Sequence, residues 1–234
     1  MVLQVKDIYT SYGESRILFG LSLSVDEGEV VTLLGRNGVG KTTTLRSIMG
    51  LTPPESGSIT FMGEEIAGKR AYQVAQLGIG LVPEDRRIFP NHTVRENLEV
   101  AEKLSPSGTK VWTVEKVYEL FPQLKELDGQ QGRFLSGGEQ QMLTIARTLM
   151  GNPKLLLLDE PAEGLAPILV KMLGEFIVRI REEGYTLLIS EQNIKFAMDF
   201  SSRIYILHKG RIGFEGSPDE LRRNEEIKKK YLAV

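Results

Sequence analysis

The stretch GRNGVGKT at residues 35–42 constrains the fold of this chain more than any other. It fits the pattern G-x-x-x-x-G-K-[ST] and lies between an apolar run, EVVTLL at 29–34, and a stretch of helical character, TTTLRSIMG at 42–50. Glycines allow successive backbone amides to turn toward phosphate oxygens, and the amino terminus of the following helix adds positive potential. The flanking strand and helix disfavour a simple glycine-rich turn, so the stretch predicts a nucleotide-binding loop in an α/β domain.

The residue types of this loop suit a triphosphate. Lys41 supplies a point charge for the phosphates and is expected to act in catalysis as well as in binding, and Thr42 can offer its hydroxyl to Mg²⁺. The residues predicted to bind the nucleotide are Gly35, Arg36, Asn37, Gly38, Val39, Gly40, Lys41, Thr42 and Thr43.

A second motif, LLLLDE at residues 155–160, has the composition of a buried strand that ends in two adjacent carboxylates. At the end of the strand both side chains can reach the phosphates, Asp159 toward the Mg²⁺ shell and Glu160 toward an attacking water. The alternative is a solvated strand end without chemistry. Because a phosphate loop precedes it, the pair predicts a nucleoside triphosphatase.

The stretch LSGGEQQ at residues 135–141 has the signature of a helix start. Ser136 and Glu139 are spaced as a capping box, which is a structural role. Two glycines in the first turn cost a helix roughly 1 kcal/mol each relative to alanine. We interpret them as leaving the amino terminus bare so that a phosphate can approach its amides.

The rest of the chain is organised around these motifs. LSLSV at 21–25 alternates apolar and polar residues, and together with 2–9 it predicts a small antiparallel sheet. Helical spacing dominates from about 86 to 150, with a capping box at Thr93 and a break at SPSG, 105–108.

Buried strands resume at KLLLLDE and YTLLISE, joined by a helix over about 168–182. We therefore expect a single domain over 1–234. About 1–85 and 151–234 form a parallel-sheet core with the antiparallel part, and about 86–150 form a helical insertion.

Composition excludes several classes of protein. Lys and Arg number 29 against 31 Asp and Glu, and the formal charge of −2 gives no electrostatic footprint of a dedicated nucleic-acid binder, which leaves a local basic patch as the alternative. Without cysteine, neither a disulfide framework nor a thiolate metal site is possible. The first residues do not suit a signal peptide, and no apolar run approaches the roughly 18 residues of a membrane span. Any membrane role is therefore expected to come through a partner.

The motifs GRNGVGKTT, LSGGEQQ and LLLLDEP, in this order and with a helical insertion between the first two, resemble the ATP-binding cassette of ABC transporters. The resemblance covers essentially the whole chain. It implies an α/β P-loop NTPase fold with a RecA-like parallel-sheet core, an N-terminal antiparallel β subdomain and an inserted helical subdomain. It also implies ATP and Mg²⁺ as cofactors.

The same resemblance implies a head-to-tail dimer with a second cassette, either a homologous chain or a second copy. ATP would lie between the phosphate loop of one cassette and the signature residues of the other. Those signature residues are Ser136, Gly137, Gly138 and Glu139. Tyr12 would lie against the adenine ring, although an aromatic near a strand end could equally serve in packing.

Three further stretches resemble one of the two cassettes of branched-chain amino acid importers: VPEDRRIFPNHTVRENL at 82–98, DEPAEGLAP at 159–167 and SEQN at 190–193. Gln192 stands where most cassettes carry a histidine that touches the γ-phosphate. Its amide can donate a hydrogen bond there but cannot exchange a proton near neutral pH, so the catalytic base must be Glu160.

Glu84 stands where most cassettes carry a glutamine that reaches Mg²⁺. It is expected to be a metal ligand together with Thr42 and Asp159, with a surface ion pair to Arg86 or Arg87 as the alternative. Ile88, Phe89 and Pro90 beside it are candidates for contact with a partner, with core packing as the alternative.

By resemblance, the predicted function is ATP hydrolysis that energises an importer, with branched-chain amino acids as the transported substrate. The expected partners are integral membrane permease subunits and no nucleic acid, at the cytoplasmic face of the inner or cell membrane. One alternative is a soluble cassette acting on nucleic acid or the ribosome, which usually carries a long coiled-coil insertion or two cassettes in one chain. Another is a binding module with dead chemistry, against which Lys41, Asp159 and Glu160 argue.

Overall fold

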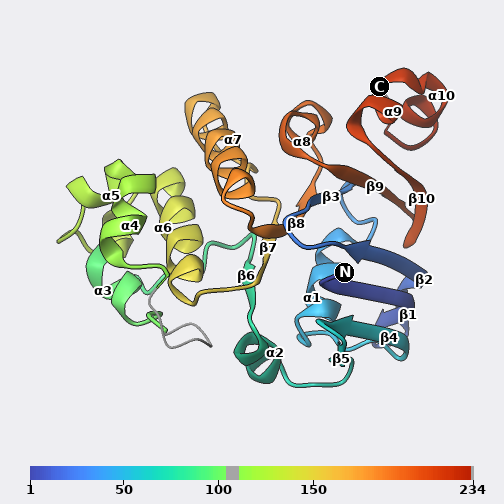
Figure 1. Ribbon diagram of the computed structural model, residues 1–234, viewed down its shortest axis with the longest axis horizontal. Helices are drawn as coiled ribbons and strands as arrows, with labels where there is room; N and C mark the ends of the chain where they lie inside the picture. The colour runs from blue at the N-terminus through green and yellow to red at the C-terminus, as the bar shows by residue number, and fades with distance from the viewer. Residues whose placement is uncertain (104–110, 233–234) are drawn as a thin grey trace.

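The fold consists of two sheets and a group of helices (Figure 1). A computed structural model describes residues 1–103 and 111–232, so the expected break at 105–108 lies outside the described residues.

The first sheet is antiparallel and has the strand order β2-β1-β4-β5. Its strands are β1 (Leu3–Tyr12), β2 (Ser15–Val25), β4 (Ser56–Phe61) and β5 (Glu64–Glu65). The first two strands are longer than the expected 2–9 and 21–25, and the ladder between them contains several register shifts. At such bulges the alternation of apolar and polar residues is interrupted, so the sequence pattern shows only part of each strand.

The second sheet has the order β10-β9-β3-β8-β7-β6 and is parallel except for the antiparallel pair of β9 and β10. Its strands are β3 (Val30–Leu34), β6 (Ile79–Val82), β7 (Leu155–Asp159), β8 (Thr186–Glu191), β9 (Arg203–His208) and β10 (Arg211–Gly216). The three strands expected to be buried, β3, β7 and β8, lie next to one another and are buried along their whole length.

Helices cover both faces of this sheet. They are α1 (Lys41–Ile48), α2 (Ala71–Leu77), α3 (Val94–Glu99), α4 (Val114–Leu120), α5 (Pro122–Glu126), α6 (Gly137–Met150), α7 (Pro167–Glu182), α8 (Ile194–Phe200), α9 (Pro218–Arg223) and α10 (Glu225–Ile227). The expected helix over 168–182 is α7, and the expected capping boxes at Thr93 and Ser136 are confirmed.

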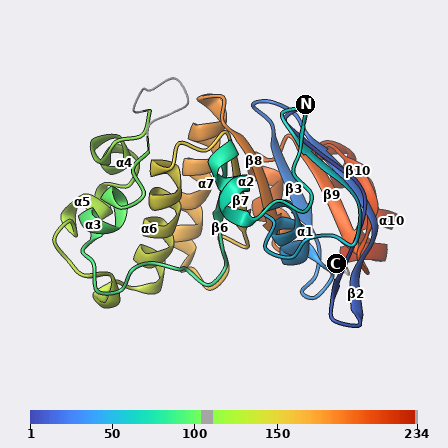
Figure 2. The same ribbon diagram turned by 90° about the horizontal axis from the view of Figure 1, so that it is seen from below.

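Alternate residues of the central strand β7 enter two different apolar cores. Leu156 and Leu158 of β7 join a core built with α3 to α8, whereas Leu155 and Leu157 join a core built with β1, β2, β4, α1 and α2. The six-stranded sheet is therefore the middle layer of the molecule. Figure 2 shows α3 to α6 grouped at one side and the strands of both sheets at the other.

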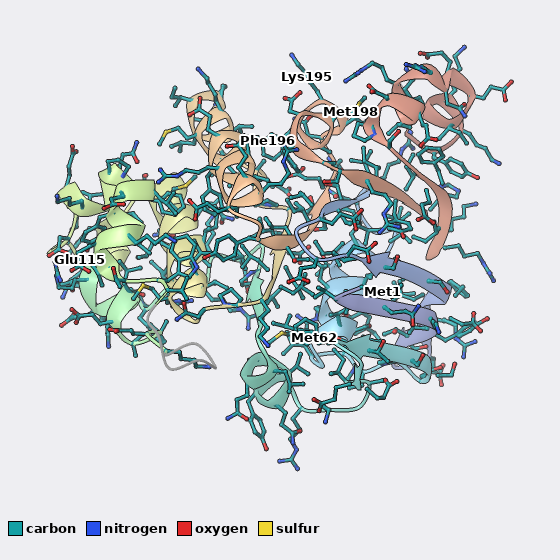
Figure 3. All side chains as sticks on the ribbon, in the orientation of Figure 1. Met1, Met62, Glu115, Lys195, Phe196 and Met198 are labelled. Carbon is teal, nitrogen blue, oxygen red and sulfur yellow. The ribbon has the colours of Figure 1, made fainter. Side chains whose placement is uncertain are left out.

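The carboxyl ends of β3, β7 and β8 meet at one edge of the parallel sheet, next to the start of α1. Helix α8 follows β8 at this edge, and its Phe196 lies between α8 and α7 (Figure 3). The expected phosphate loop and the expected carboxylate pair therefore come to the same edge.

The phosphate loop is hydrogen-bonded to a hairpin that lies far from it in the sequence. Gly210, in the turn between β9 and β10, donates from its amide to Val39 O at 3.0 Å, and its carbonyl oxygen accepts from Phe19 N of β2 at 3.0 Å. Its φ is 72°. A Cβ at this position would collide with the carbonyl oxygen of Ile17, so only glycine fits where the two sheets meet.

Candidate functional site

The phosphate loop between β3 and α1 has the backbone that its glycines allow. Gly38 and Gly40 have φ of 77° and 112°, and a Cβ at Gly40 would lie 2.7 Å from Leu18 Cδ2. Gly40 is the residue before the first turn of α1. Arg36 and Asn37 are exposed, so the outer part of the loop is open to a ligand.

Lys41 lies at the base of this loop and is only 3% exposed. Its Nζ donates to Gly35 O at 2.8 Å and Arg36 O at 3.0 Å, and forms an ion pair with Glu160 Oε1 at 3.1 Å. The sequence therefore brings the expected phosphate-binding charge and the expected catalytic base into direct contact.

Glu160 is held in a rarely populated backbone conformation. Its φ is 45°, in the left-handed region that residues with a Cβ seldom adopt. Its amide donates to both the carbonyl oxygen of Ser190, at 3.1 Å, and the Ser190 hydroxyl, at 3.0 Å. The end of β8 therefore fixes the residue that follows β7.

Asp159 lies between two hydroxyl groups. Thr42 Oγ1 donates to Asp159 Oδ1 at 3.1 Å, and Ser190 Oγ donates to the same oxygen at 2.6 Å. Burial raises the pKa of Asp159, and these two hydrogen bonds oppose the rise. The hydroxyl and the carboxylate expected to hold Mg²⁺ are thus neighbours in the structure.

Carboxylates are crowded around Glu160. The pKa of Glu84 is raised by desolvation and by repulsion from Glu160 and Asp159. The pKa of Glu163 is raised by its hydrogen bond to Glu160 and by desolvation. This edge of the sheet is therefore short of positive charge, which a divalent cation would supply.

Hydroxyl and carboxylate oxygens are the hard ligands that Mg²⁺ prefers. Within 1–103 and 111–232, no group of three or more His, Cys, Asp or Glu could by itself hold a metal ion. The residues present therefore fit a Mg²⁺ ion that takes one or two carboxylates and a hydroxyl from the protein and fills its remaining positions with phosphate oxygens and water.

Glu84 forms neither of the two alternative ion pairs. Arg87 pairs with Asp85 at 2.8 Å, and Arg86 donates to the carbonyl oxygen of Glu163 at 3.1 Å. The alternative of a surface ion pair with Arg86 or Arg87 is therefore wrong. Glu84 remains an exposed carboxylate near Asp159, and its role as a metal ligand stays a prediction.

Gln192 and Tyr12 both present exposed side chains. Gln192 follows β8 directly and is exposed. Tyr12 ends β1, is 46% exposed, and accepts a hydrogen bond from Thr52 Oγ1 at 3.4 Å. The ring of Tyr12 thus lies outside the apolar cores, and the contact with adenine stays a prediction.

Glu191 is a buried carboxylate to which the sequence led us to assign no role. It is 3% exposed and accepts hydrogen bonds from the amides of Gln192, Asn193 and Ala162 at 3.1, 3.3 and 3.4 Å. Burial raises its pKa to about 7. No role was assigned to Ser190 from the sequence either. For both residues, the available sequence signal was a polar side chain directly after a run of buried aliphatic residues.

The signature residues form the expected capping box at the start of α6. The Ser136 amide donates to Glu139 Oε2 at 2.6 Å, and the Glu139 amide donates to Ser136 Oγ at 3.4 Å. Contacts within the chain also require glycine at both positions. A Cβ at Gly137 would meet the Arg86 guanidinium, and one at Gly138 would meet the Leu169 side chain of α7.

The signature residues are not joined to the chain's own phosphate loop. Among the described residues, no hydrogen bond or ion pair connects 135–139 with 35–43. Figure 1 shows α6 beside α7, on the side of the parallel sheet away from the antiparallel sheet.

Candidate partner-contact residues Ile88 and Phe89 differ in burial. Ile88 packs against the core that contains α6, as in the core-packing alternative, whereas Phe89 is 44% exposed. The Arg147 guanidinium of α6 lies 4.9 Å from the centre of the Phe89 ring.

Comparisons with known proteins agree on one family. Residues 18–163 match the family described as ABC transporter. The chain is 42% identical over 231 residues, 99% of each chain, to the high-affinity branched-chain amino acid transport ATP-binding protein BraG of Pseudomonas aeruginosa. It is 36% identical over 237 residues, 99% of this chain and 97% of the other, to the lipopolysaccharide export system ATP-binding protein LptB of Haemophilus influenzae.

Solved structures give the same result. A nucleotide-free ATP-binding cassette from an ABC transporter has a TM-score of 0.79 and 28% identity, covering 100% of this chain and 95% of that one. CbiO1 of Clostridium perfringens, part of the ABC transporter complex CbiONQ, has a TM-score of 0.78 and 27% identity, covering 98% of this chain and 93% of that one.

Proposed function

Because this chain belongs to the ATP-binding cassette family of ABC transporters, we propose that it is the subunit that energises an importer of branched-chain amino acids. It binds ATP and is an ATPase of this family. The predicted fold class is confirmed: an α/β P-loop NTPase with a parallel-sheet core, an antiparallel β part and a helical part. We retain the subdomain boundaries near 85 and 150 as part of the proposal.

The hydrolytic step follows from the charges at the edge of the parallel sheet. Lys41 donates to phosphate oxygens, and Gln192 donates to the γ-phosphate as a neutral group. Thr42, Asp159 and Glu84 would hold Mg²⁺, which would neutralise charge on the phosphates. Glu160, whose Oε1 lies 3.1 Å from Lys41 Nζ, accepts a proton from the attacking water.

The partner of this site is a second cassette in a head-to-tail dimer. Residues Ser136 to Glu139 cap a helix that has no bond to its own phosphate loop among the described residues. A helix amino terminus with free amides suits the phosphates of a neighbouring molecule. In that arrangement Tyr12 contacts the adenine of the ATP bound by its own chain.

Transport across a membrane requires integral membrane subunits, and the described residues of this chain do not supply a membrane-spanning helix. No helix within 1–103 or 111–232 has the length and apolarity to cross a membrane. In the proposed role, permease subunits hold the chain at the cytoplasmic face of the inner or cell membrane, and no nucleic acid takes part. The similarity to BraG supports branched-chain amino acids, whereas the similarity to LptB supports lipopolysaccharide export as a second candidate.

The observation that carries the proposal is the contact of Lys41 with Glu160 beside the paired Thr42 and Asp159. Glu160→Gln keeps the shape of the side chain but removes the base. We expect it to lower turnover about a hundredfold or more while ATP stays bound, because a positioned base contributes on that scale. The measurements are phosphate release and retained nucleotide.

The control is Glu119→Gln, which alters an exposed carboxylate on α4. Turnover of this variant is expected to stay within about threefold of the wild type, since Glu119 belongs to none of the proposed site residues. Unchanged turnover in Glu160→Gln would overturn the assignment of the site.

The transport role has its own test, which is to isolate the tagged chain from detergent-solubilised membranes. Co-purification of two membrane subunits with a second, different cassette supports the importer. Complexes that contain lipopolysaccharide support the export system instead, and complexes with ribosomes or DNA support the soluble alternative.

A further inference from the structure

Ser190 is a buried hydroxyl that contacts both Asp159 and Glu160 of the proposed site. It is fully buried at the end of β8, directly opposite Asp159 in the ladder between β7 and β8. Its Oγ donates to Asp159 Oδ1 at 2.6 Å and accepts from the Glu160 amide at 3.0 Å. One side chain thus connects the residue expected to hold the metal with the residue expected to activate water.

The hydrogen-bonding capacity of a serine hydroxyl matches this arrangement. A hydroxyl has one proton to donate and lone pairs to accept with. At Ser190 the proton goes to Asp159, and a lone pair receives the amide of Glu160. The direction of both bonds is therefore fixed, because a carboxylate cannot donate and an amide cannot accept.

The backbone of Glu160 requires such support. Its φ of 45° is disfavoured for any residue with a Cβ and persists only where the surroundings hold it. The Glu160 amide is shared between the carbonyl oxygen and the hydroxyl of Ser190, at 3.1 and 3.0 Å. Without the hydroxyl, only one of these two acceptors remains.

Asp159 depends on the same hydroxyl for its orientation. Both of its hydroxyl partners, Thr42 and Ser190, donate to Oδ1. Thr42 is also expected to offer its oxygen to the metal, whereas Ser190 is fully buried within β8. Ser190 is therefore the partner that can stay in place when a metal ion is bound.

We propose that Ser190 is a positioning residue for ATP hydrolysis, whose hydroxyl holds the Asp159 carboxylate and the Glu160 backbone in one fixed arrangement. This inference rests on the proposed roles of Asp159 and Glu160. It adds a residue on β8 to a site that the sequence motifs assign only to the phosphate loop and to the end of β7.

The test compares Ser190→Ala with Ser201→Ala. Ser201 is a matched control: it is a buried serine whose hydroxyl bonds to Thr32 Oγ1, at 2.7 Å, and to Ala197 O, at 2.5 Å, away from the carboxylates. Both variants lose a buried hydroxyl, so both are expected to be less stable. Only Ser190→Ala removes the support of the site.

For Ser190→Ala we expect kcat to fall roughly tenfold to a hundredfold, because misplaced catalytic groups cost on that scale, while KM for ATP changes by less than about threefold. Equilibrium binding of a fluorescent ATP analogue without Mg²⁺ should be unchanged. The Mg²⁺ concentration that half-saturates binding of the same analogue should rise severalfold. Ser190→Thr, which keeps the hydroxyl, should restore most of both properties.

A kcat and a Mg²⁺ midpoint in Ser190→Ala that match those of Ser201→Ala would overturn the inference. If Ser190→Ala does not fold, as judged by circular dichroism, Ser190→Cys takes its place, because its thiol is a weak donor in nearly the same volume. Normal kcat in Ser190→Cys would overturn the inference equally. If Glu160→Gln does not block turnover, the proposed function itself is overturned. Failure of the proposed function and failure of this inference are therefore distinguishable.

Discussion

Glu191 is a buried carboxylate at which the fold bears an electrostatic cost. Its three amide hydrogen bonds favour the charged form, yet burial raises its pKa from 4.5 to about 7. The folded protein therefore binds this proton more tightly than the unfolded chain does. As the pH rises from about 4.5 to about 7, the unfolded chain releases its proton first, so this group makes the fold progressively less stable.

Glu191→Gln removes this titration while keeping an acceptor for the amides. Between about pH 5 and about pH 8, we expect the free energy of unfolding of the variant to improve relative to the wild type by on the order of 2–3 kcal/mol. Urea unfolding at several pH values measures the difference. Substitution of the exposed Glu14 by glutamine is the control, and a difference for Glu191→Gln that does not change with pH would contradict the expectation.

The residues of the site differ in how far the sequence could predict them. The phosphate loop and the pair Asp159 and Glu160 lie in contiguous motifs, so their chemistry can be inferred from the sequence without a structure. Ser190 acts on residues about thirty positions earlier in the chain, and its contacts exist only because β7 and β8 pair in register. Such a role depends on strand pairing, which a single sequence does not specify.

At the scale of elements, helix starts were the most predictable features. The capping boxes expected at Thr93 and Ser136 are both present, with backbone amide to glutamate distances of 2.7 and 2.6 Å. Ser217 caps α9 in the same way, with its amide 2.6 Å from Glu220 Oε2. The strands β1 and β2 were predicted only in part, because their register shifts interrupt the alternating pattern. The requirement for glycine at position 137 was predicted only in part. The close approach of Arg86, which also requires it, comes from a segment about fifty residues away.

The two capping serines allow structure and function to be separated. Ser136→Ala and Ser217→Ala each remove a cap, so each is expected to lower the free energy of unfolding by about 1 kcal/mol. In a Glu160→Gln background with Mg·ATP, only Ser136→Ala should also weaken association of the cassette. Urea unfolding and light scattering after size-exclusion chromatography provide the two measurements. Equal association of both variants would argue against a signature that contacts the partner's ATP.

At the scale of the whole molecule, the backbone hydrogen bonds of Gly210 connect the carboxyl-terminal hairpin with the antiparallel sheet and the phosphate loop. Nothing in the sequence around residue 210 indicates this role, because a glycine in a hairpin turn is ordinary. The role arises from the neighbouring backbone of Ile17, which leaves no space for a Cβ.

Gly210→Ala is expected to destabilise the protein by roughly 2–4 kcal/mol, since it combines backbone strain with a steric clash. Gly13→Ala is the matched control, because Gly13 also has a positive φ, 58°, but a methyl group added there would have no atom within 4 Å. Its cost should be only about 1–2 kcal/mol. Thermal and urea unfolding give both values, and similar losses in the two variants would contradict the clash.

The strand order has a consequence for the growing polypeptide. Strand β3, which ends in the phosphate loop, lies between β8 and β9, although those two strands are made some 150 residues later. A nascent chain that has emerged only as far as β7 carries the complete glycine-rich motif but lacks both neighbours of the strand that supports it. ATP affinity should therefore arise late in synthesis, and a chain truncated before β8 should be unable to bind the nucleotide despite its intact motif.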